Sequence, residues 1–181
     1  MKKKFILSVL FCFGFLLTFG QSIDSKFKFI KKLADIEEYL YEPNGLTILL
    51  IKDNSTPVVT TQITYNVGSK HEVSGNTGST HLLEHLLFKG TPKYNKETLT
   101  IASALQNVGA RMNATTWYDR TNYYETIPSD FLKLALDIEA DRMRNSLLKA
   151  EDKAAEMTVV RNEFERGENN PNRLLSKEIW S

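Results

Sequence analysis

Residues 78–91 of the chain read GSTHLLEHLLFKGT. Leucines at positions 82, 83, 86 and 87 recur at the spacing of one helical face, and Gly90, Thr91 and Pro92 end the pattern. We therefore expect a short amphipathic helix whose apolar side is buried against another layer of structure. The other side of this helix carries two histidines and a glutamate, which makes it the first candidate for a functional site.

The two histidines, His81 and His85, are four residues apart. Four residues turn an α-helix by about 400°, so both imidazoles project from one side, one turn apart, and can bind a single zinc ion. Glu84 lies about 60° around the helix from His81. Its carboxylate can therefore take a proton from a water on the same metal, in the His-x-x-Glu-His order of some zinc peptidases. The alternative is an amphipathic helix that carries these side chains without a metal.

A catalytic zinc held by two histidines needs a third protein ligand. Glu156 and Glu163 are seven residues apart on a helix predicted over residues 150–167, so they share a face two turns apart. One can bind the metal while the other supports the site through hydrogen bonds. Two solvated glutamates on a charged helix are the alternative, and the residues alone leave both interpretations open.

The rest of the chain predicts an α+β fold. Asn44 and Gly45 separate two apolar runs, residues 36–41 and 46–51, which is a strong hairpin signal. Further strands are predicted at residues 58–67, 110–118 and 120–127, and further helices at 96–108, 131–147 and 150–167, with a last helical pattern beginning at 174. Hairpins without β-α-β units favour an antiparallel sheet layered with helices.

Composition excludes several classes of protein. The chain has 181 residues, with 23 Lys and Arg against 22 Asp and Glu, a net charge of +1. No basic excess is available to neutralise phosphates, so we expect no nucleic-acid partner. The one cysteine excludes an intrachain disulfide framework and a cysteine-rich zinc site.

The first twenty residues have the pattern of a signal peptide. Three lysines at positions 2–4 precede an apolar run over residues 5–19 and the small residue Gly20. The run is shorter than the roughly 20 residues that span a bilayer, so we expect no stable membrane span. We predict a signal peptide over 1–20, a mature domain over 21–181, and export to the periplasm or the cell exterior. Recovery of a mature protein that still begins at Met1 would refute this prediction.

Over roughly residues 41–173 the chain resembles the pitrilysin/insulinase family of zinc metallopeptidases, which includes processing peptidases. The stretch 78–91 carries most of the resemblance. The other matching motifs are Asn44-Gly45-Leu46-Thr47, the segment 53–57, Val67-Gly68-Ser69, Glu72, Gly109-Ala110, Asn113-Ala114-Thr115, Asp119-Arg120-Thr121, Tyr123-Tyr124 and Glu139-Ala140-Asp141-Arg142-Met143.

The resemblance implies a role for each candidate residue. One Zn²⁺ per active domain would be bound by His81, His85 and Glu163, with Glu84 as the catalytic base. Glu156 would match the family's second glutamate, which supports the site without binding the metal. The gap between His85 and Glu163 is slightly longer than the family pattern, and Glu165 is the nearest alternative ligand.

The resemblance also implies a substrate and a partner. An extended, unfolded peptide would add as a strand beside Asn113, Ala114 and Thr115 and be cleaved there by a metal-activated water. The implied fold is an antiparallel sheet with helices packed on one face, continuing beyond Ser181. A related inactive domain or subunit, not present in this chain, would complete the enzyme, so residues 21–181 alone are expected to be weakly active. The alternative function is a non-catalytic peptide-binding or scaffold half of a paired metallopeptidase assembly.

Overall fold

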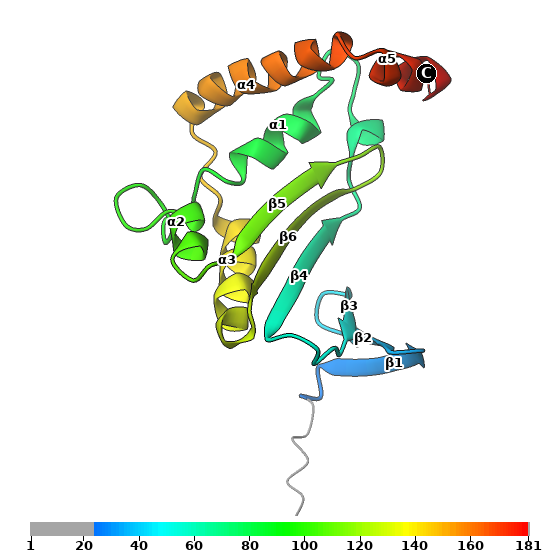
Figure 1. Cartoon of the computed structure of the whole chain (residues 1–181), viewed down its shortest axis with the longest axis vertical. Coiled ribbons are helices and arrows are strands. Elements are labelled where there is room, and N and C mark those ends of the chain that lie inside the picture. Colours follow the sequence, from blue (N-terminus) through cyan, green and yellow to red (C-terminus); the bar gives the residue numbers. More distant parts are fainter. Residues whose placement is uncertain (1–23, 181) are drawn as a thin grey trace, which may run out of the picture. The chain divides into compact units, whose positions relative to one another are not determined.

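The computed structural model describes residues 24–180, which fall into two compact units with their boundary after Asn54 (Figure 1). The predicted signal peptide lies outside the described residues. Within residues 24–180 no helix combines the length and the apolar character needed to cross a membrane.

The first unit is an antiparallel sheet of three strands in the order β1-β2-β3. Its strands are β1 (Phe27–Leu33), β2 (Ile36–Tyr41) and β3 (Leu46–Ile51). The predicted hairpin at Asn44 and Gly45 is confirmed: Gly45 has a φ of 75°, and the side chain of Asn44 accepts a hydrogen bond from the backbone of Leu46. Strand β1 was not expected, because the turn that joins it to β2 uses Ala34 at a φ of 50° and carries no glycine signal.

The second unit contains the remaining elements. They are β4 (Val58–Tyr65), η1 (Ser69–His71), α1 (Ser79–Leu86), α2 (Ile101–Gln106), β5 (Arg111–Thr116), β6 (Thr121–Pro128), η2 (Ser129–Phe131), α3 (Leu132–Asn145), α4 (Ala150–Glu168) and α5 (Pro171–Trp180). The strands form an antiparallel sheet in the order β4-β6-β5. Among the described strands, β5 pairs with β6 alone, so its other edge is free.

Helices cover one face of this sheet, as predicted. Ala114, Tyr123 and Ile127 point to the covered face and are almost completely buried, while Asn113 and Thr115 lie exposed on the other face. Helix α1 packs on β5, α3 packs on β4 and β6, and α4 packs on α1 (Figure 1). The antiparallel α+β fold class is therefore confirmed.

Helix α2 is shorter than the helix predicted over residues 96–108. It begins after Thr100, whose hydroxyl accepts a hydrogen bond from the backbone N–H of Ser103 at 3.1 Å and so caps the helix. Upstream, the side chain of Asn95 accepts from the backbone N–H of Glu97 at 2.8 Å, which holds that segment in a turn. Local side-chain hydrogen bonds thus replace the first predicted helical turn.

A buried charged cluster ties α3 to the sheet and to the segment after α1. The guanidinium of Arg142 donates to Glu125 and Glu139 and lies 4.1 Å from the ring centroid of Tyr123 and 5.2 Å from that of Phe88. Burial, together with the neighbouring Glu125, raises the pKa of Glu139 to about 9, although Arg142 opposes the shift. Arg142 pairs with both carboxylates, and its ion pair with Glu139 is the closer of the two.

Candidate metal centre

The loop before α1 anchors the N-terminus of that helix through Glu72. Its carboxylate accepts hydrogen bonds from the backbone N–H groups of Gly78 at 2.7 Å and Thr80 at 2.8 Å, and from the hydroxyl of Thr80 at 2.5 Å. Partial burial would raise the pKa of Glu72, but the hydrogen bonds from Thr80 and Gly78 outweigh it and leave the pKa below its usual value. An ionised Glu72 therefore occupies the positive end of the helix.

The predicted ligands are brought together by α1 and α4. The Nε2 atoms of His81 and His85 lie 3.2 Å apart, and Oε2 of Glu163 lies 3.5 Å from the first and 3.6 Å from the second. A tetrahedral zinc ion with bonds of about 2.0–2.1 Å holds its ligand atoms roughly 3.3–3.4 Å apart. Two imidazole nitrogens and a carboxylate oxygen at these separations fit zinc in chemistry and in spacing.

Glu156 holds the ring of His85. Its Oε2 lies 2.9 Å from Nδ1 of His85, and its other oxygen pairs with the ammonium of Lys89. Burial would raise the pKa of Glu156, but the hydrogen bonds from Lys89 and His85 outweigh it and lower the pKa. When Nδ1 donates to this ionised carboxylate, Nε2 carries the lone pair and is directed at the other two ligands.

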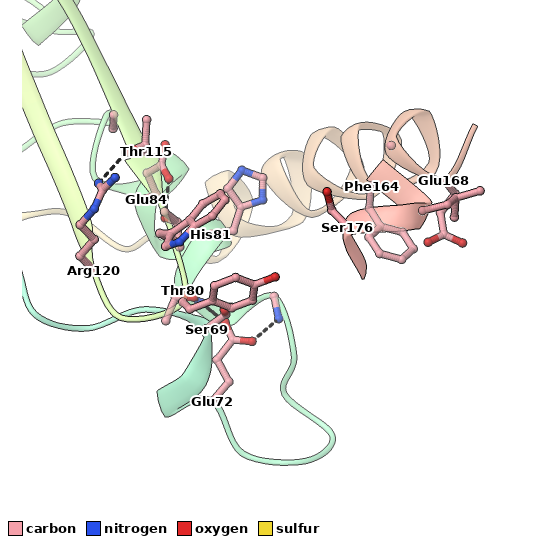
Figure 2. A pocket seen from close by; sticks show the side chains of 17 residues that line it. Ser69, Glu72, Thr80, His81, Glu84, Thr115, Arg120, Phe164, Glu168 and Ser176 are labelled. Carbon is pink, nitrogen blue, oxygen red and sulfur yellow. Dashed lines mark hydrogen bonds between the residues drawn. The ribbon is translucent and has the colours of Figure 1, made fainter. Parts of the chain in front are cut away.

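Glu84 lies in the wall of a cavity of about 960 Å³ that His81 also lines (Figure 2). Its side chain is 8% exposed and accepts a hydrogen bond from the hydroxyl of Thr116 on β5. In Figure 2, Phe164 and Glu168 of α4 lie on the other side of the cavity. A carboxylate is thus placed beside the ligand cluster without being part of it.

The structure separates the three predicted substrate-binding residues. Ala114 and Thr115 line the cavity, whereas Asn113 is not among its lining residues. The side chain of Asn113 accepts from the backbone N–H of Ala114 at 2.9 Å. The hydroxyl of Thr115 donates to Asn122 at 2.7 Å and accepts from Arg120 at 3.2 Å.

Sequence reasoning missed three cavity-lining residues at the end of β5, namely Thr116, Trp117 and Tyr118. A signal for Thr116 was present: alternation along a strand places it on the same side as Ala114, facing α1. The two aromatic residues belong to the turn after β5, where no periodic pattern predicts a direction.

Three comparisons relate this geometry to known proteins. The family model described as Insulinase (Peptidase family M16) matches residues 47–181. An uncharacterized zinc protease of Streptomyces coelicolor is 39% identical over 129 residues, which cover 71% of this chain and 28% of that protein. The beta subunit of the mitochondrial-processing peptidase of Caenorhabditis elegans is 33% identical over 123 residues, 68% of this chain and 26% of the subunit.

A solved structure agrees with the sequence comparisons. The crystal structure of a protease from Helicobacter pylori superposes with a TM-score of 0.70 at 30% identity, covering 79% of this chain and 34% of that one. An uncharacterized zinc protease of Rickettsia felis is 33% identical over 138 residues, 76% of this chain and 33% of the relative. The chain therefore spans about a third or less of the length of the relatives it matches.

Proposed function

The chain belongs to the insulinase family, peptidase family M16, and from this premise we propose that it is a zinc endopeptidase that hydrolyses peptide bonds of unfolded peptides. The observation that carries the proposal is the triangle of His81, His85 and Glu163, spaced for one zinc ion, with Glu84 beside it in a shared cavity. The relatives named as zinc proteases support the same chemistry.

We assign the metal to His81, His85 and Glu163, one ion per chain. Bound zinc would lower the pKa of a water toward 7 and polarise the peptide carbonyl. Glu84 accepts the proton of the attacking water at its carboxylate and passes it to the leaving amine. Glu156 holds His85 in the tautomer that the metal requires.

We propose that the substrate binds along the free edge of β5. An extended peptide can pair there through its main chain, which gives affinity without strict sequence demands. Ala114 and Thr115 are on this strand and line the cavity that contains Glu84. An extended, unfolded peptide exposes the backbone groups that such pairing needs.

We also propose a related second domain or subunit as partner, and export of the chain. The partner is supported by the greater length of the relatives, one of which is named a subunit. Export is supported by the lysines and the apolar run at the start of the sequence.

The experiment that tests the catalytic proposal compares two variants for zinc content and peptide hydrolysis. Glu84→Gln removes the base but no ligand, so we expect zinc at about one per chain and a rate at least about 100-fold lower. His81→Ala removes a ligand and should lose both zinc and activity. Full hydrolysis by Glu84→Gln would contradict the role of the base, and normal zinc content in His81→Ala would contradict the ligand set. Zinc near zero in the unsubstituted chain would favour the non-catalytic alternative.

A further inference from the structure

We propose that Thr116 is a positioning residue for Glu84: its hydroxyl holds Oε2 of the carboxylate and thereby leaves Oε1 to receive the proton. The inference rests on the proposed function, because it gives Glu84 the role of base. It assigns a task to a residue that is neither a metal ligand nor one of the predicted substrate contacts.

The fold brings these two side chains together from different elements. Thr116 is the last residue of β5, and the alternation along that strand turns it with Ala114 toward the helices. Helix α1 packs on β5 and buries Glu84, which is 8% exposed. The hydroxyl of Thr116 donates a hydrogen bond to Oε2 of Glu84.

The direction of the hydrogen bond follows from counting protons. An ionised carboxylate has only acceptor oxygens, so the Thr116 hydroxyl must be the donor. The hydroxyl of Thr121 lies 3.5 Å from that of Thr116 and donates its own proton to the carbonyl of Val67 at 2.9 Å. The single proton of Thr116 is therefore free for Glu84, and a hydrogen bond to a charged acceptor is among the stronger kinds.

A hydrogen bond to Oε2 of Glu84 also restricts the position of Oε1, the other oxygen of the same carboxylate. A glutamate has three rotatable side-chain bonds, and a base that rotates freely spends little time in the geometry for proton transfer. Anchoring Oε2 restricts this freedom in a side chain that lines the same cavity as His81, and Oε1 is the oxygen left to accept the proton. Thr116 belongs to β5, the strand whose free edge we propose as the peptide-binding site. The same strand would therefore position both the substrate and the base.

The first test observes Glu84 directly in the metal-free full chain. The chain is labelled with ¹³C at the side-chain carboxyl carbons of glutamate and studied by NMR. The carboxyl resonance of Glu84 is identified as the one that disappears in Glu84→Gln. We expect this signal to shift in Thr116→Val, which keeps the side-chain shape but removes the hydroxyl, and to keep its position in Thr116→Ser. The matched control is Thr60→Val, the same change on the exposed face of the same sheet, which should leave the signal in place.

The second test measures peptide hydrolysis by the zinc-loaded chain. Thr116→Val should lower kcat by about 10- to 100-fold with little change in KM, because the base is misplaced while the binding edge is intact. Thr116→Ser should restore most of the loss. A Glu84 signal that does not move in Thr116→Val, or an unchanged kcat in that variant, would overturn the proposal. If the unsubstituted chain cleaves no peptide, the proposed function fails, while the carboxyl signal still decides whether Thr116 holds Glu84.

Discussion

At the scale of single residues, the two glutamates of α4 make different contacts although they share one helical face. Glu163 presents an oxygen within 3.6 Å of both imidazole Nε2 atoms. Glu156 contacts the opposite nitrogen of His85, and Lys89 neutralises it from the other side. In the proposed metal site Glu156 would therefore fix the ring of His85 and increase the electron density at its Nε2.

This division predicts the effect of Glu156→Gln. An amide cannot supply the negative charge that favours the required tautomer of His85, so we expect the affinity for zinc to fall about 10- to 100-fold while zinc still binds. Competition with a chromophoric chelator measures this. Glu165→Gln is the matched control, since Glu165 is on the same helix and is not part of the ligand cluster. Equal affinities of the two variants would contradict the assigned role.

The sequence alone placed these residues on one face but did not divide their roles. Spacing of seven residues predicts a shared direction, and it applies equally to either glutamate. The division of roles came from the resemblance, and it stays a prediction. Thr116 escaped sequence reasoning because its partner is 32 positions away in the chain, and no local pattern specifies which hydroxyl a buried carboxylate will meet.

At the scale of elements, α1 depends on its surroundings. An isolated helix of eight residues is not stable in water. This one is held by the burial of Leu82 and Leu86 and by the hydrogen bonds from its first turn to Glu72. The anchor also fixes where the helix starts, and through it the directions of His81 and His85.

The pH dependence of this anchor is a testable consequence. The pKa of folded Glu72 lies below the usual value of 4.5, so its carboxylate adds stability above about pH 4.5, and this is lost as the pH falls through the lowered folded-state pKa. We expect Glu72→Gln to reduce the free energy of unfolding by about 1 kcal/mol at pH 7. This is the size of effect seen when the side chain that caps the N-terminus of a helix is removed at a site open to solvent.

Urea unfolding of the unsubstituted chain and of Glu72→Gln, repeated from pH 7 down to about pH 3, measures the difference in the free energy of unfolding between them. This difference in the free energy of unfolding should shrink as the carboxylate of Glu72 in the unsubstituted chain is protonated. The control is Glu97→Gln, at an exposed glutamate outside this anchor. A difference that stays constant with pH would rule out the charge of Glu72 as its source.

Helices and strands with a clear repeat of apolar residues could be predicted from the sequence. Element boundaries that depend on local side-chain hydrogen bonds could not. The hairpin at Gly45, the strands at 58–65 and 121–128 and the helices at 132–145 and 150–168 follow their sequence patterns within a few residues. The start of α2 depends on Thr100 and Asn95, whose side chains compete with helix formation. The strand at 27–33 mixes lysines with apolar residues and turns at Ala34, so neither its pattern nor its turn was visible beforehand.

At the scale of the whole molecule, the second unit contains every predicted ligand, but the ligands come from two helices far apart in the chain. Helix α4 buries few of its residues, chiefly Glu156 and Gly167. Its packing against α1 therefore contributes little apolar burial. A metal bound by His81, His85 and Glu163 would join the two helices directly.

Zinc should therefore stabilise the folded chain against heat. A ligand that binds only the folded state adds about 2.7 kcal/mol at a free concentration 100-fold above its Kd, which for a protein of this size raises Tm by roughly 5–10 °C. Differential scanning calorimetry with and without zinc measures the shift. Glu163→Gln should reduce it strongly, because it weakens the ligand that α4 contributes, whereas His71→Ala should preserve it, since His71 belongs to η1 and not to the ligand cluster. An equal shift in Glu163→Gln would mean that zinc stabilises the chain without joining α4 to α1.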